Sequence, residues 1–63
     1  MAAPRTSEQC RDQLRAVIRE AVAEAAPERR EALLTMADHW ADLLKLRLAQ
    51  EAREDHARRT RPT

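Results

Sequence analysis

The chain has 63 residues, of which 43% are hydrophobic and 37% are charged, and it contains one aromatic residue and no glycine. So short a chain forms at most one domain, and its small core barely offsets about 1.5 kcal/mol of conformational entropy per ordered residue. One cysteine excludes an internal disulfide and a Cys₄ or Cys₂His₂ zinc site. We therefore expect self-association as the source of stability. We expect no enzyme, because so few residues cannot enclose a catalytic pocket.

The charge pattern limits the partners and the compartment. Twelve basic and eleven acidic residues give a net charge of +1, which provides no general attraction to nucleic acid or anionic lipid. The longest uncharged stretch, residues 32–37, is far shorter than the roughly 18–20 residues of a membrane span, so we expect no membrane partner. The first residues carry no apolar segment typical of a secretory signal. Together with the lone cysteine, this predicts a cytoplasmic protein.

The first predicted helix covers residues 6–26, and residues 1–5 are expected to be disordered. Thr6 and Gln9 fit a capping box, in which each side chain accepts from the other's backbone N–H, and Ser7 is the alternative N-cap. The apolar residues of this helix recur three and four positions apart and share one face. They are Cys10, Leu14, Val17, Ile18, Ala21, Val22 and Ala25.

Pro27 separates the two predicted helices. It disfavours helical dihedrals at Ala26 and suits the first position of a new helix. We expect the second helix to cover residues 27–58, followed by a disordered basic tail at residues 59–63. A single helix kinked at Pro27 is the alternative.

The second helix carries an apolar stripe that ends well before the helix does. If the first helix folds back from Pro27, its 20 or so residues end near residue 47, and the stripe ends at Leu48. This agreement favours an all-α fold, an antiparallel two-helix hairpin with a long second helix overhanging the first. The stripe consists of Leu33, Met36, Ala37, Trp40, Ala41, Leu44 and Leu48, with Leu34 and Leu43 at its edges.

Short segments of both helices resemble a group of short bacterial helical-hairpin proteins. That group opens with Glu-x-Cys-Arg, as in Glu-Gln-Cys-Arg at residues 8–11, and its second helix carries Leu-Leu-x-Met-Ala-x-x-Trp, as at residues 33–40. The match spans most of residues 8–48, although Val17, Ile18 and Val22 replace the usual Ala-rich run. The resemblance implies a two-helix hairpin and carries over no active site.

The apolar arc of the second helix is too wide for one short helix to cover, which predicts a homodimeric four-helix bundle or a higher oligomer. Leu43 and Leu46 lie beside His39, away from Trp40, and indicate a second contact surface. We therefore predict an interaction or adaptor protein that binds itself and offers a groove to a helix of another protein. The predicted core and interface residues are Cys10, Leu14, Val17, Ile18, Val22, Leu33, Met36, Trp40, Leu43, Leu44, Leu46 and Leu48.

Charged rows border the stripe of the first helix. Arg11, Arg15 and Arg19 form a basic row on one margin, and Glu20 and Glu24 form an acidic row on the other. Like charges four residues apart repel by a few tenths of a kcal/mol, so these rows become favourable where opposite charges lie across an interface. A solvated helix surface is the alternative interpretation.

The basic C-terminal segment gives the alternative function, a small dimeric regulator that contacts nucleic acid phosphates. Glu51, Glu54 and Asp55 in the same segment, and the lack of an aromatic residue for base stacking, make nucleic acid the less favoured partner. The candidate contact residues are Arg53, Arg58, Arg59 and Arg61.

No residue spacing is typical of a metal or cofactor site, and we expect neither. Asp38 and Asp42 share a helix face, but His39 points about 100° away from Asp38. Cys10 on an apolar face is typical of a small core residue, and a reactive thiol beside Arg11 is the alternative.

Overall fold

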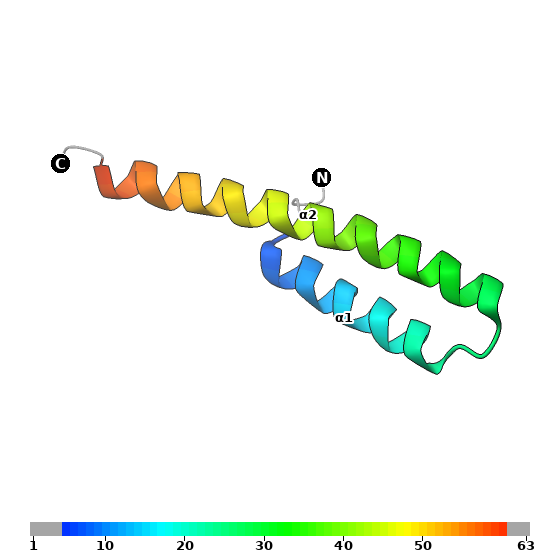
Figure 1. The fold of residues 1–63 in the computed structure, drawn as a ribbon. Helices are drawn as coiled ribbons and strands as arrows, with labels where there is room; N and C mark the ends of the chain where they lie inside the picture. Colours follow the sequence, from blue (N-terminus) through cyan, green and yellow to red (C-terminus); the bar gives the residue numbers. More distant parts are fainter. Residues whose placement is uncertain (1–4, 61–63) are drawn as a thin grey trace.

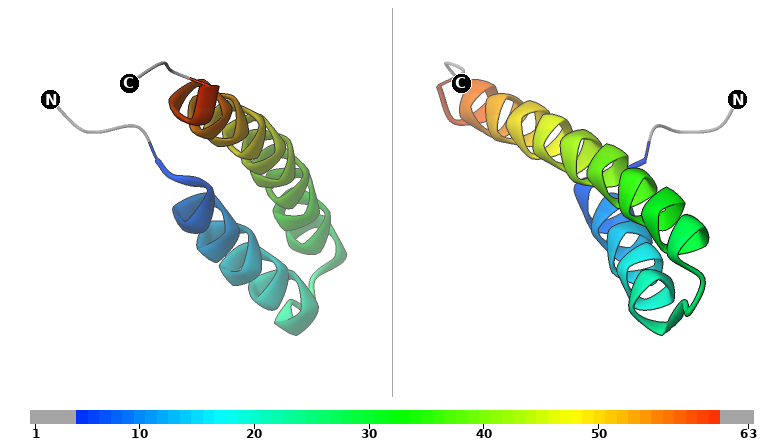
Figure 2. Two further views of the ribbon diagram at one scale, coloured as in Figure 1. Left: turned by 90° about the vertical axis from the view of Figure 1, so that its left-hand side faces the viewer. Right: turned by 45° about the vertical axis from the view of Figure 1, so that its right-hand side comes forward.

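The computed structural model describes residues 5–60, which form two helices joined by a short connection (Figure 1). Helix α1 covers Ser7–Ala23, and helix α2 covers Pro27–Thr60. Both views of Figure 2 show α1 folded back along the first part of α2, while the rest of α2 continues beyond it. The hairpin is 57 Å long and 13 Å in its thinnest direction. The predicted all-helical hairpin is confirmed for these residues, and a single helix kinked at Pro27 is excluded.

The helix ends differ in part from the predicted boundaries. The capping box is present, with Gln9 N–H donating to Thr6 Oγ1 at 3.2 Å and Thr6 N–H donating to Gln9 Oε1 at 2.9 Å, so Thr6 is the N-cap. Helix α1 ends at Ala23 instead of residue 26, because the chain needs three residues to reverse before Pro27. Residues 59 and 60, predicted to be disordered, are helical. The predicted disorder of residues 1–4 and 61–63 lies outside the described residues.

The connection reverses the chain without glycine. Glu24 leaves α1 in an extended conformation, with φ −81° and ψ 122°. Its carbonyl oxygen, which has no partner within the helix, accepts from Arg30 Nε at 3.1 Å and from Arg30 Nη2 at 2.7 Å. The carbonyl of Ala26 then accepts from Arg30 N–H at 3.0 Å and opens α2. Because side chains satisfy this helix end, no left-handed glycine is needed.

The contact between the helices follows a heptad spacing. Cys10, Val17, Ala21 and Ala37 are buried. Half-buried residues continue the same alternation of three and four positions, as in a coiled coil. We call this set the seam. It comprises Ser7, Cys10, Leu14, Val17, Ala21 and Glu24 on α1 and Leu33, Ala37, Trp40, Leu44, Arg47 and Glu51 on α2.

The register of the seam is fixed at its open end. Ser7 donates to the Glu51 carboxylate from its backbone N–H at 3.0 Å and from its hydroxyl at 2.5 Å. From this contact, each step forward along α1 corresponds to one step back along α2, which places Ala21 level with Ala37. Two small buried side chains therefore lie at about the same level near the connection, where small residues favour a close approach of the helices.

The seam is narrower than the predicted apolar stripe. Met36, Leu48, Ile18 and Val22 were expected in the stripes that face the other helix, but all four are exposed, and Val22 is 80% exposed. The physical reason is that two antiparallel helices share only one row of alternating positions, and on α2 this row passes through Arg47 in place of Leu48. Apolar side chains beside this row remain open to solvent.

Candidate interaction surface

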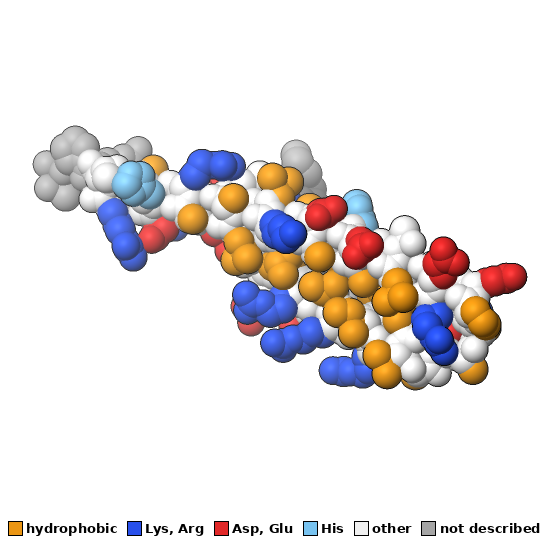
Figure 3. Space-filling model, in the orientation of Figure 1, with side chains coloured by type: hydrophobic (Ala, Val, Ile, Leu, Met, Phe, Trp, Pro, Cys, Tyr) orange, Lys and Arg blue, Asp and Glu red, His pale blue; other side chains and the backbone are white. Residues whose placement is uncertain are grey.

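One side of the hairpin carries exposed apolar residues from both helices. Because a helix rotates by about 100° per residue, the residue that follows each seam position points to one side of the seam, and in antiparallel helices both sets reach the same side. Ile18 and Val22 occupy such positions on α1, and Leu34 and Leu48 occupy them on α2. Ile18, Leu34 and Leu48 are 44%, 49% and 43% exposed. We call these four residues the front face, and Figure 3 views the hairpin from this side, with hydrophobic side chains spread over both helices.

The two helices carry mainly opposite charges on this side. On α1, Arg11 and Arg15 directly follow seam residues, as Ile18 and Val22 do, and Arg19 lies further around the helix. On α2, Asp38 directly follows a seam residue and Asp42 lies further around the helix. All five side chains are exposed, and we call these two sets of residues the charged edges. Figure 3 shows Lys and Arg side chains along α1 and mainly acidic side chains along the middle of α2. The ion pairs within residues 5–60 join other residues, and of the charged edges only Arg11 acts on a charge of its own hairpin, that of Glu51. These pairs are Arg29–Glu24 at 3.8 Å and Arg59–Asp55 at 3.1 Å.

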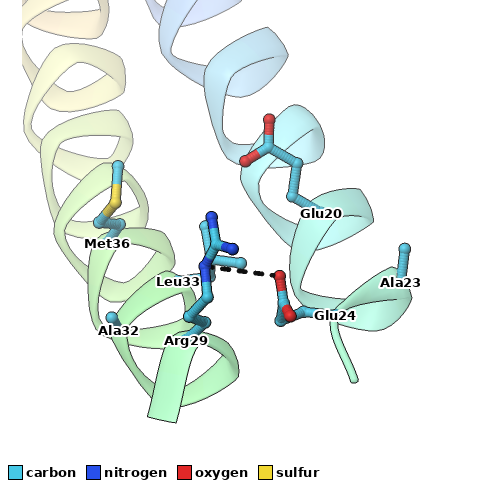
Figure 4. A pocket seen from close by; sticks show the side chains of 7 residues that line it. All are labelled: Glu20, Ala23, Glu24, Arg29, Ala32, Leu33 and Met36. Atoms are coloured by element: carbon cyan, nitrogen blue, oxygen red, sulfur yellow. Dashed lines mark ion pairs between the residues drawn. The ribbon is translucent and has the colours of Figure 1, made fainter. Parts of the chain in front are cut away.

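The opposite side, which we call the rear face, is apolar on one helix only. Met36, Leu43 and Leu46 lie there on α2, one position before seam residues, whereas α1 contributes mainly polar side chains such as Gln13 and Glu20. Near the connection, the rear face opens into a shallow cleft of about 440 Å³, crossed by the Arg29–Glu24 ion pair (Figure 4). The cleft is lined by Glu20, Ala23, Glu24, Arg29, Ala32, Leu33 and Met36.

The cleft is lined by two carboxylates, one guanidinium and four apolar side chains. Its lining contains no serine, cysteine or histidine, so a nucleophile with an adjacent base is not assembled there. Leu33 and Met36 supply the apolar wall on α2.

Trp40 is half-buried in the seam, and two residues outside the seam also contact its ring. The guanidinium carbon of Arg5 lies 4.9 Å from the centre of the Trp40 ring, within the range of a cation–π contact. The ring of His39 meets it edge-on at 6.2 Å. The contact with Arg5 could not be predicted from the sequence, because the residues before the helix show no periodicity.

The open end of the seam is polar. The two hydrogen bonds from Ser7 lower the pKa of Glu51 below its ordinary value of 4.5, and the positive charges of Arg47 and Arg11 add to this effect. Arg47 Nη1 donates to Gln50 Oε1 at 2.9 Å, while Arg47 Nε is buried and has no hydrogen-bond partner among residues 5–60. Arg47 and Glu51 are seam residues that the apolar pattern of the sequence does not predict. A strict heptad count from Leu33 would have identified both.

The remaining candidate residues are not brought together. Cys10 is fully buried and free, which favours its structural role in the seam. Arg53, Arg58 and Arg59 are exposed on the overhanging part of α2, and Arg61 lies outside the described residues. Within residues 5–60, no three His, Cys, Asp or Glu side chains are grouped so that they could hold a metal ion. Over the same residues, neither helix has the length and apolar character needed to cross a bilayer.

Comparison with protein-family models, curated proteins and solved structures gave no match to this chain. The resemblance to short bacterial helical-hairpin proteins therefore stays a prediction, and the functional argument depends on the surfaces described above.

Proposed function

We propose that this chain is a small non-catalytic interaction protein that self-associates through its front face. The observation that carries the proposal is the exposure of Ile18, Val22, Leu34 and Leu48 together on one side of the hairpin. Removing apolar surface from water contributes roughly 25 cal/mol per Å², so an uncovered surface of this kind favours a partner of matching character.

The small interior of the hairpin supports the same proposal. Among residues 5–60, the buried class contains only Cys10, Val17, Ala21 and Ala37, and two of these four are alanines. Such a core offsets little of the roughly 1–2 kcal/mol of backbone entropy lost by each ordered residue. Pairing two hairpins through their front faces adds apolar burial and gives a four-helix bundle.

Sedimentation velocity over a range from low to high micromolar concentration tests the proposal. We expect the wild-type chain to shift from monomer to dimer, and we expect Val22→Glu to remain monomeric in that range while keeping its helicity. Val22 is chosen because it is 80% exposed and lies outside the seam. Leu46→Glu on the rear face is the matched control and should dimerise like the wild type. A wild-type chain that stays monomeric throughout contradicts the proposal, and a loss of dimer in Leu46→Glu alone would assign the contact to the rear face.

The overhanging part of α2 supports a second candidate function. Arg53, Arg58 and Arg59 project beyond α1 on an exposed helix, where they are accessible to phosphates of a nucleic acid. Glu54 and Asp55 in the same turns reduce this positive potential, and Asp55 pairs with Arg59. Titration with duplex DNA and with RNA at two salt concentrations tests this candidate. Binding that weakens steeply with salt supports it, and no binding at low salt removes it.

A further inference from the structure

We propose that the second copy docks front face to front face about a two-fold axis parallel to the helices, so that α1 of each copy packs against α2 of the other. This inference rests on the proposed self-association and specifies the orientation of the partner. It also assigns a role in that orientation to the charged edges beside Ile18, Val22, Leu34 and Leu48.

Two symmetric arrangements bring the front faces of two hairpins together. In the first, the axis is parallel to the helices, and each α1 lies antiparallel to α2 of the other copy. In the second, the axis lies in the contact plane and runs across the helices, so α1 faces α1 and α2 faces α2. The second arrangement places the basic row of one copy opposite the same basic row of the other, which is repulsive. The first places the basic row opposite the acidic edge.

In the first arrangement, the seam register determines which residues of the two copies lie at the same level. A rotation about an axis parallel to the helices moves no residue along that axis, so residues that are level within one hairpin are also level between copies. Counting from the Ser7–Glu51 hydrogen bonds, Arg15 of one copy lies within one residue of the level of Asp42 of the other, and Arg19 lies within one residue of the level of Asp38. One residue is about 1.5 Å along a helix, which a long arginine side chain spans easily.

Lys45 is a basic residue within the acidic edge of α2. The residue of α1 at the same level in the other copy is acidic, although the neighbouring residues of its row are basic. At the level of Lys45, the other copy presents Asp12 next to Arg11. Asp12 offsets the repulsion between the two basic side chains. In chain order α2 carries Asp38, Asp42 and Lys45. The antiparallel α1 of the other copy presents Arg19, Arg15 and Asp12 at the corresponding levels, so each charge meets one of opposite sign.

Part of the apolar front face also matches in this arrangement. Val22 of one copy lies near the level of Leu34 of the other, and Ile18 lies near the level of Ala41, whereas Leu48 lies near the level of Arg11. Helix α1 is about 25 Å long and two packed helices are about 20 Å wide, so each copy covers about 500 Å² and the pair about 1,000 Å². This is near the lower limit for specific dimers, where charge complementarity decides orientation more than area does.

Charge reversal on separate chains tests the orientation. The double variant Arg15→Glu/Arg19→Glu and the double variant Asp38→Lys/Asp42→Lys each place like charges in both copies of the contact. We expect each variant alone to raise the dimer dissociation constant by about 10- to 100-fold, as four exposed pairs turn from attractive to repulsive. An equimolar mixture of the two should form a heterodimer with an affinity near that of the wild-type homodimer. Circular dichroism of each variant establishes that the helices are intact.

Three other outcomes would show whether the orientation, the role of the charged edges or the self-association itself is wrong. If the arginine-reversed variant binds the wild-type chain more tightly than the wild type binds itself, α1 faces α1 and the proposed orientation is wrong. If both variants dimerise like the wild type, the charged edges play no part and the inference is also wrong. A monomeric wild-type chain would instead overturn the proposed self-association itself.

A distance measurement gives an independent readout of the orientation. We expect spin labels on Ala57→Cys in a Cys10→Ala background to lie within about 25 Å of each other, because both overhangs then project from the same end of the bundle. In the arrangement with α1 against α1, the overhangs point in opposite directions and the labels are separated by about 45 Å. The longer distance would refute the parallel axis.

Discussion

The carboxylate of Glu51 accepts hydrogen bonds from both the backbone N–H and the hydroxyl of Ser7, 44 positions earlier in the chain. The N–H of Ser7 belongs to the first turn of α1 and has no partner within that helix. Helix α2 thus supplies a negative charge at the N-terminus of α1, where the helix dipole favours it. This contact marks the end of the paired segment and fixes which residues meet along the seam.

The lowered pKa of Glu51 predicts a specific pH dependence of folding. Because the pKa is lower in the folded chain, the ionised carboxylate stabilises the fold above the ordinary value of 4.5, and this contribution is lost as pH falls through the lower, folded-state pKa. Glu51→Gln should therefore melt below the wild type at pH 7, and the difference should shrink as pH falls below 4.5. Thermal melts followed by circular dichroism measure this difference. Glu54→Gln, an exposed carboxylate on the same helix, is the control, and an equal effect in both variants contradicts the assigned role.

The buried Nε of Arg47 predicts a stabilising substitution. A buried donor without a partner costs about 1–3 kcal/mol, and an apolar side chain at a seam position avoids this cost. We expect Arg47→Leu to raise the free energy of unfolding by about 1–2 kcal/mol in urea denaturation. Arg53→Leu, at an exposed site on the overhang, should leave stability within about 0.5 kcal/mol of the wild type. A destabilised Arg47→Leu would show that the hydrogen bond to Gln50 and the charge beside Glu51 outweigh the buried donor.

The connection depends on Arg30. Its side chain donates two hydrogen bonds to the otherwise free carbonyl of Glu24, so Arg30→Ala should lower the free energy of unfolding by about 1–2 kcal/mol. The neighbouring Arg29 is a matched control, because its side chain is exposed and its ion pair with Glu24, at 3.8 Å, is worth about 0–1 kcal/mol. Equal effects of Arg29→Ala and Arg30→Ala in the same denaturation series would contradict this account of the chain reversal.

Trp40 provides both a stability test and a probe. A buried tryptophan replaced by alanine costs about 3–5 kcal/mol, and because Trp40 is only half-buried we expect Trp40→Ala to cost about 2–3 kcal/mol. Since it is the single tryptophan of the chain, its fluorescence reports on the seam and on the Arg5 contact. Arg5→Ala should change the emission while leaving the helicity intact. Unchanged melting of Trp40→Ala would remove this residue from the set that holds the helices together.

The sequence predicted two helices because its two strongest local features are independent of tertiary structure. It predicted the hairpin because the apolar stripe of the second helix ends where a folded-back first helix would end. The capping box at Thr6 and Gln9 acts within four residues, and Pro27 restricts its own neighbourhood. The contact row was harder to predict, because the sequence offers apolar side chains over nearly half of α2 and only the partner helix selects among them. Arg47 belongs to the seam because its position faces α1. A stripe defined by hydrophobicity alone does not include it.

The candidate surface was also predictable only in part, in its local charge pattern but not in how the two helices align. The basic row of Arg11, Arg15 and Arg19 was recognised from its spacing, but its relation to Asp38 and Asp42 depends on the register, which is set by Ser7 and Glu51. Both residues of that contact are polar, and neither belongs to the apolar pattern from which the elements were predicted. A heptad count applied to the charged residues would have placed the basic row and the two aspartates on the same side of the hairpin.

Because α2 is longer than α1, we expect the chain to unfold locally from one end. Beyond Glu51, α2 has no neighbouring helix within the described residues, so its last turns persist only by local backbone hydrogen bonding. Amide protons there should exchange with deuterated solvent far sooner than those beside Cys10 or Ala37. A protease that cleaves after arginine should accordingly trim the molecule from this end and leave a truncated but intact pair of helices.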